Sequence, residues 1–145
     1  MIRVSVQPAP IDLATELAGA EVEGAGGIAS FIGSVRGEGG VTELTLEHYP
    51  GMTEGALIGL AEKAFDRWGL LAVTIVHRVG PMVPGDRIVF IATAAAHRAP
   101  ALEACAYLID RLKTDAPFWK RETRGNAAEW VEAKTSDDAA AARWR

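Results

Sequence analysis

Residues 97–122 read HRAPALEACAYLIDRLKTDAPFWKRE, and the rest of the chain is organised around this segment. Pro100 stands in the first turn of an expected helix, where a proline costs no hydrogen bond. Apolar residues then recur at helical spacing, and they are Ala101, Leu102, Cys105, Leu108, Ile109 and Leu112. Pro117 ends the helix. The pattern predicts one helix with a His-Arg pair at its start and two lysines at and beyond its end.

The segments before this helix alternate between strand and helix patterns. Residues 53–68 carry an apolar stripe at helical spacing, with Thr53 as the expected cap and Gly69 as the stop. A shorter helix is expected after Asp12, which can cap it. Alternating or apolar runs predict strands at residues 2–6, 28–35, 41–49, 71–79 and 88–94, and short extended pieces at 118–122 and 129–133.

This order of elements, β-α-β-β-α-β-β-α-β-β, predicts the fold class. It indicates an α+β architecture with mostly antiparallel strands and with the helices on one side. A length of 145 residues is most simply one domain, residues 1–145. The polar, alanine-rich tail at about 135–145 is expected to be either helical or flexible.

Composition narrows the class of protein. Apolar residues make up 49% of the chain and charged residues 23%, which is typical of a soluble globular protein. No apolar run approaches a membrane span and no signal peptide is evident, so a cytoplasmic protein is expected. The single cysteine cannot form an internal disulfide, which agrees with a reducing compartment. A net charge of −4 argues against broad binding to nucleic acid or membranes, so any anion site must be local.

Charged and aromatic side chains mix in the second half of residues 97–122. Lys113 falls at the border of the apolar stripe, so its stem can pack while its amine stays available. Lys113 and Lys120 converge on one pocket only if the chain turns back between them, which Pro117 permits. A plain solvated face seldom carries two large rings such as Phe118 and Trp119. These residues therefore indicate a cationic pocket.

A second candidate anion site lies where a strand leads into the helix at His97 and Arg98. Free backbone N–H groups and the helix dipole favour an anion there, and arginine adds a bidentate fork. An arginine–carboxylate pair near a helix start explains the same residues equally well. His77, on an apolar strand face, is more often a buried, hydrogen-bonded histidine than a catalytic one. The histidines and the cysteine show no metal-ligand spacing, so neither a metal nor a cofactor is expected.

Five motifs follow one another along the chain and cover roughly residues 28–138. They are FIGSVR (31–36), LEHYPGM (46–52), HRVG (77–80), AHR (96–98) and LKTDAPFWKRE (112–122). In this order they resemble the large, catalytic subunit of molybdopterin synthase. The resemblance implies an α/β hammerhead fold with an additional antiparallel β-sheet.

The resemblance also implies an enzyme, a sulfurtransferase of molybdenum cofactor biosynthesis. Family members convert cyclic pyranopterin monophosphate (precursor Z) to molybdopterin by inserting two sulfurs as a dithiolene. The sulfur comes from the C-terminal Gly-Gly thiocarboxylate of a small ubiquitin-like carrier subunit. A homodimer of large subunits forms the core of a heterotetramer, with the sites at the dimer interface. The alternative is a non-catalytic module that binds a ubiquitin-like tail or a nucleotide-like anion.

Roles for single residues are implied by position in the resembling motifs. Lys113 matches a lysine beside the carrier's terminal carbonyl, and Lys120 matches one that assists proton transfer or holds the substrate. The substrate-binding positions are Arg36, His97, Arg98 and Phe31, with Arg36 serving its own pocket or the neighbouring subunit's. Lys134 is the fifth substrate-binding position, and it stands where arginine is expected in many relatives. Lysine keeps the charge there but loses the bidentate fork.

Overall fold

Two four-stranded sheets form the framework of the protein. The structure is a computed structural model that describes residues 1–131 and 135–144. The first sheet has the order β1 (Ile2–Gln7), β4 (Ala72–Arg78), β6 (Arg87–Ala95) and β2 (Gly27–Ser34). The second has the order β5 (Gly80–Met82), β3 (Glu43–His48), β7 (Phe118–Arg124) and β8 (Ala127–Val131). Within this part of the chain, every strand pairing except the parallel β1–β4 pair is antiparallel. The predicted α+β class is confirmed.

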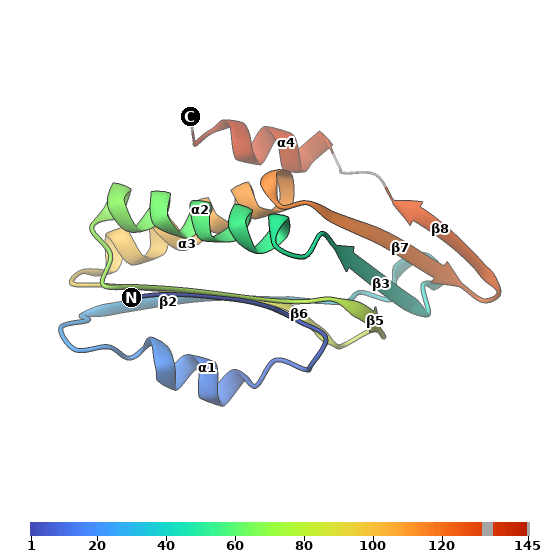
Figure 1. Cartoon of the computed structure of the whole chain (residues 1–145), viewed down its shortest axis with the longest axis horizontal. Helices are drawn as coiled ribbons and strands as arrows, with labels where there is room; N and C mark the ends of the chain where they lie inside the picture. The colour runs from blue at the N-terminus through green and yellow to red at the C-terminus, as the bar shows by residue number, and fades with distance from the viewer. Residues whose placement is uncertain (132–134, 145) are drawn as a thin grey trace.

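The helices lie on both faces of the first sheet, so the prediction that they share one side was wrong. α2 (Met52–Trp68) and α3 (Arg98–Asp115) cover one face, whereas α1 (Leu13–Ala20) covers the other (Figure 1). The reason is that β4 and β6 are apolar on both faces. Val76 and Phe90 face α1 and pack with Ile11 and Ala20. A short 3-10 helix, Glu38–Gly40, lies between β2 and β3.

The start of α2 differs from the prediction that Thr53 caps it. Gly51 is the N-cap residue, with a φ of +84° that suits glycine, and its N–H donates to Glu54 Oε1 at 3.0 Å. Thr53 lies inside the helix and is fully buried. Its hydroxyl accepts the N–H of Tyr49 and donates to the carbonyl of Pro117, each at 3.0 Å. Thr53 thus ties the start of α2 to the connection between α3 and β7.

The other predicted helix ends are confirmed. The Asp12 carboxylate accepts the N–H of Thr15 at 3.2 Å and caps α1. Gly69 ends α2 in the left-handed conformation, with a φ of +59°. In α3, however, Leu102 is 60% exposed rather than buried. Cys105 is buried as predicted, and burial raises the pKa of its thiol to about 11.

The C-terminal tail is helical and lies outside the α2–α3 layer (Figure 1). After α4 (Thr135–Ala142), the ring of Trp144 packs edge-on against Trp68 and Tyr107, with 5.8 Å between ring centroids in each pair. Its indole N–H donates to Asp110 Oδ2 at 2.7 Å. The Arg67 guanidinium lies 4.6 Å from the centre of the Trp68 ring. These contacts fix the end of the chain to α2 and α3.

Three apolar clusters hold the layers together. The largest lies between the first sheet and the α2–α3 pair, and a smaller one lies under α1. The third joins the two sheets through Val35, Leu44, Leu46 and Met82. Within residues 1–131 and 135–144, no helix combines the length and the apolar character needed to cross a membrane.

Candidate functional site

A cavity of about 690 Å³ lies where the two sheets meet the C-terminal end of α3. Its floor is apolar and includes Phe31, Leu44, Leu46, Leu112 and Phe118. Its charged lining consists of Arg36, Glu38, Lys113, Lys120, Glu122 and Arg124. Cations therefore outnumber carboxylates in a protein whose net charge is negative, which suits an anionic ligand.

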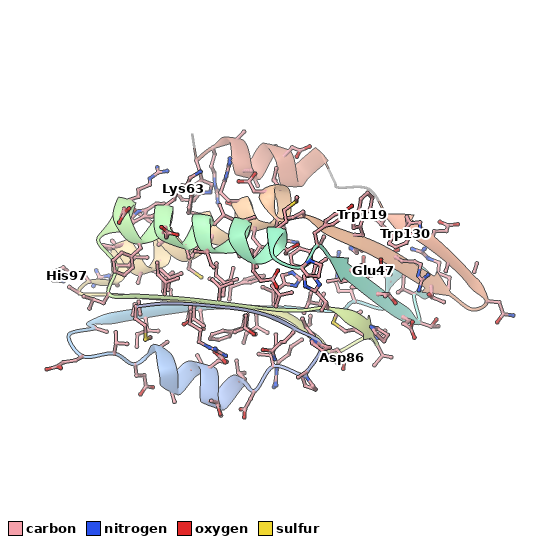
Figure 2. The ribbon with its side chains drawn as sticks, in the orientation of Figure 1. Glu47, Lys63, Asp86, His97, Trp119 and Trp130 are labelled. Carbon is pink, nitrogen blue, oxygen red and sulfur yellow. The ribbon has the colours of Figure 1, made fainter. Side chains whose placement is uncertain are left out.

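Strand β7 presents Lys120 to the cavity because its side chains alternate between two faces. Phe118 and Lys120 share the inner face, whereas Trp119 lies on the outer face and is 52% exposed. Figure 2 shows Trp119 on this strand and Trp130 on the neighbouring β8. The two tryptophan rings meet edge-on with their centroids 6.3 Å apart. The tryptophan of the motif therefore does not line the cavity.

Lys113 reaches the same cavity from the last turn of α3. The chain leaves the helix at Ala116, and the N–H of Phe118 donates to the Ala116 carbonyl at 3.0 Å. The chain then turns back into β7, which places Lys113 and Lys120 around one space. The structure thus brings together Lys113, Lys120, Arg36 and Phe31 within a single chain.

Glu122 and Arg124 are cavity residues that the sequence analysis missed. Glu122 lies 2.8 Å from Arg124 Nη2 and 3.8 Å from Lys120 Nζ. Arg124 Nε also donates to the Gly39 carbonyl at 2.9 Å, which ties the glycine-rich segment between β2 and β3 (residues 36–40) to β7. In that segment Arg36 pairs with Glu38 at 3.2 Å, where both side chains are largely exposed. The period of two from Lys120 along residues 118–124 is the signal that finds both missed residues.

His77 is buried, as the sequence favoured, and it also forms part of the cavity lining. Its ring stacks on Phe118, with centroids 3.9 Å apart and planes 22° apart. Nδ1 lies 2.9 Å from the Arg78 carbonyl oxygen. Burial lowers the pKa of His77 to about 4, opposed by the bond to Arg78 and helped by the charges of Lys113 and His48. The imidazole is therefore neutral at neutral pH.

His97 and Arg98 lie at the opposite end of α3 and do not line the cavity. Fifteen residues of helix separate Arg98 from Lys113, a rise of about 22 Å. Figure 2 shows His97 at the end of the molecule remote from Trp119. Strand β2 begins beside this helix start, because a Cβ on Gly27 would lie 2.8 Å from the Arg98 Cα. Within one chain, the structure does not unite the two predicted groups.

Two further predictions concern Lys134 and metal binding. Lys134 lies outside the described residues, as do 132 and 133 at the end of the expected strand 129–133. Among residues 1–131 and 135–144, no cluster of three or more His, Cys, Asp or Glu side chains is placed to hold a metal ion.

Comparison with known proteins identifies the family. The family model described as MoaE protein matches residues 6–115. A molybdopterin synthase catalytic subunit from Escherichia coli (strain K12) is 46% identical over 146 residues, which cover 98% of this chain and 97% of that protein.

Solved structures agree with this match. The molybdopterin biosynthesis MoaE protein from Burkholderia ambifaria MC40-6 superposes with a TM-score of 0.87 at 46% identity, covering 99% of this chain and 98% of that one. A complex of subunits 1 and 2 of molybdopterin-converting factor from Helicobacter pylori 26695 contains a chain with a TM-score of 0.77. At 21% identity over 92% of this chain and 91% of that chain, it shows the shared fold alone. From the family match and these full-length similarities, the chain belongs to the MoaE protein family, the family of molybdopterin synthase catalytic subunits.

Proposed function

We propose that this chain transfers sulfur from the thiocarboxylated C-terminus of a small ubiquitin-like carrier to precursor Z, and so forms the dithiolene of molybdopterin. The observation that carries the proposal is the cavity in which Lys113, Lys120 and Arg36 meet from three separate segments. At about 690 Å³, this cavity of mixed charged and apolar lining would have room for an extended peptide tail and a phosphorylated heterocycle together. The names of the relatives support the same reaction.

The residues fit the charge changes of this chemistry. The thiocarboxylate sulfur is itself the nucleophile, so the protein does not need to supply one. Transfer instead needs positive charge to offset the phosphate and the thiocarboxylate, and a donor for the departing oxygen. We assign Lys113 to the carrier's terminal carbonyl, as its position in the LKTDAPFWKRE motif of the family implies. Lys120, on the facing strand, is assigned to proton transfer or to holding the substrate.

The substrate phosphate requires a second copy of the chain if His97 and Arg98 bind it. These residues lie about 22 Å of helix away from Lys113, and therefore cannot reach the cavity of their own chain. A homodimer that places them at the neighbour's cavity would complete the site next to Arg36. In the proposed function, therefore, the substrate site is complete only in the dimer.

Strand β2 offers a surface for such a dimer. It is an edge of the first sheet, and its face away from α3 exposes Ile28 and Ile32, at 41% and 39%. The strand begins beside Arg98 and leads at its other end to Arg36. Its eight residues span about 23 Å, close to the rise between Arg98 and Lys113. Antiparallel pairing of two β2 strands would exchange their ends and bring each Arg98 towards the partner's Arg36.

The carrier is the second partner in the proposal, and it would bind one copy to each large subunit in a heterotetramer. The Helicobacter pylori chain that shares this fold is described as part of a complex of subunits 1 and 2 of molybdopterin-converting factor. We place the reaction in the cytoplasm, where a reduced carrier thiocarboxylate would persist and where the lone Cys105 would stay a thiol.

Reconstitution tests the function directly. The purified chain, a thiocarboxylated carrier and precursor Z are combined, and molybdopterin is measured by the fluorescence of its oxidised form. Product formation that requires all three components is expected. Stable carrier binding without any product would contradict the proposal and favour a non-catalytic module that binds a ubiquitin-like tail. Lys63→Ala is a matched control, because Lys63 is exposed on α2, outside the cavity (Figure 2).

A further inference from the structure

His77 is a buried titratable group in the cavity that the proposed sulfur transfer does not use. It lies on β4, is 5% exposed, and stacks on Phe118 of β7. The stack and the neighbouring strands fix the plane of the ring between the two sheets. A histidine held this firmly at a cavity wall presents its remaining ring nitrogen in a fixed direction.

The hydrogen bond of Nδ1 determines the tautomer. The Arg78 carbonyl can only accept, so the proton of the neutral ring is on Nδ1. Nε2 is then unprotonated, and its lone pair can accept a hydrogen bond. Among the described residues it has no hydrogen-bond partner, and it is not one of the fully buried unpaired atoms, so it is open to the cavity.

The two carboxylates of the cavity are already engaged. The carboxylate of Glu38 pairs with Arg36, and that of Glu122 pairs with Arg124 and Lys120. Lys113, in contrast, forms no ion pair within the described part of the chain. Its charge is nonetheless close enough to depress the pKa of His77. An ammonium without a counterion and an imidazole lone pair without a donor therefore share one cavity.

We propose that His77 is a positioning residue for Lys113: its Nε2 accepts a hydrogen bond from the Lys113 ammonium and holds the amine over the cavity floor beside Phe118. The inference rests on the proposed sulfur transfer for its purpose, although not for its geometry. A carboxylate at this place would neutralise the charge that must meet an anionic thiocarboxylate. A neutral imidazole orients the amine and leaves its charge available.

Nuclear magnetic resonance tests the pairing without any enzymatic assay. Long-range ¹H–¹⁵N spectra of the full chain should show His77 as the Nδ1–H tautomer at neutral pH. The charged and titratable groups that act on this ring are Lys113 and His48. The cavity that it lines also holds Arg36, Glu38, Lys120, Glu122 and Arg124. Lys113→Met should raise the pKa of His77 from about 4 towards its ordinary value, because the Lys113 charge is removed. An Nε2–H tautomer, or a pKa unchanged by Lys113→Met, would overturn the proposal.

Two substitutions then separate positioning from packing. His77→Phe keeps an aromatic stack on Phe118 but removes the acceptor, whereas His77→Gln keeps a neutral acceptor. We expect His77→Phe to lower kcat for molybdopterin formation about ten-fold with KM nearly unchanged, and His77→Gln to recover most of the loss. Equal kcat values for the two variants, or a change confined to KM, would overturn the positioning role.

The outcomes distinguish this proposal from the function on which it rests. A wild-type chain that forms no molybdopterin but shows the expected tautomer and pKa response would refute the function and retain the His77–Lys113 pair. An active chain with the wrong tautomer would refute the pair and retain the function. If His77→Phe fails to fold, as judged by thermal unfolding, the spectra and the His77→Gln variant still decide.

Discussion

The two ends of α3 carry the two predicted groups of functional residues, and they differ in what surrounds them. At the C-terminal end, Lys113 joins Lys120 and Arg36 around a cavity that both sheets enclose. At the N-terminal end, His97 and Arg98 are exposed and line no part of this cavity. The first end is a cavity formed by one chain. The second end can contribute to a cavity only if that cavity belongs to another chain. The difference therefore predicts a site shared between two copies.

The largest effect that we expect comes from the cavity end. Lys113→Ala or Lys120→Ala should lower molybdopterin formation by roughly 1,000-fold, because each removes a charge or proton donor that acts on the reacting groups. The assay is the reconstituted reaction, with circular dichroism to confirm an intact fold. Lys63→Ala should remain fully active. Substantial product from either cavity variant would break the assignment of this end as the catalytic one.

A pH dependence of stability should also arise at the cavity end. His77 has a pKa of about 4 in the folded chain and an ordinary value of 6.5, so its contribution is fully present above pH 6.5. As the pH falls from 6.5 to 4 the unfolded chain takes up a proton first, and the free energy of unfolding should fall by up to about 3 kcal/mol. Urea unfolding across this range measures it. His77→Phe should lose this component, and an unchanged slope would show that another group causes it.

The exposed end should show a different kinetic signature. Arg98→Ala should raise KM for precursor Z about ten-fold to a hundred-fold, because a charged hydrogen bond to the phosphate is lost. Its kcat should change much less than in the lysine variants. Kinetics at varied precursor Z concentration separate the two. A loss in kcat alone would indicate that Arg98 acts in the chemical step. The two ends of α3 would then not differ in function.

The sequence predicted α3 well because the helix depends on a local pattern. Helical spacing located the helix, and Pro117 permitted the reversal that brings Lys113 and Lys120 together without requiring it. The separation of Arg98 from this cavity follows from helix length alone, and the sequence analysis did not use it. In the proposed dimer, the copy that supplies each residue depends on the exposed face of β2, which no local pattern marks as an interface.

Misses elsewhere have the same origin in long-range contacts. Thr53 fits a helix cap by type, but its hydroxyl binds the Pro117 carbonyl 64 residues away. Leu102 continues the apolar stripe of α3, yet nothing in the described structure covers it, and it stays 60% exposed. The position of α1 on the second face of the sheet depends on residues such as Phe90 of β6, which packs under α1. A pattern of alternating residues assumes that only one face of such a strand is buried.

The smallest effect concerns the surface that we propose to join the two ends. Ile32→Asp places a charge on the exposed face of β2 and should weaken dimerisation about ten-fold, because it desolvates a carboxylate at the contact. Sedimentation velocity over a concentration series measures the change. Ile58→Asp is the matched control, since Ile58 is similarly exposed, at 42%, on α2. Equal behaviour of the two variants would exclude the β2 surface as the dimer contact.

The activity of a mixed dimer tests the shared site most directly. Lys113→Ala and Arg98→Ala chains carrying different affinity tags are coexpressed, and the dimer with one copy of each is purified. If each cavity uses the partner's Arg98, the mixed dimer holds one intact and one doubly damaged site. Assayed at precursor Z concentrations well below KM, where both parent variants are nearly inactive, it should show about half of the wild-type activity. If the cavity and Arg98 served the same chain, neither site would be intact. Activity no higher than the average of the two parent variants would contradict the account.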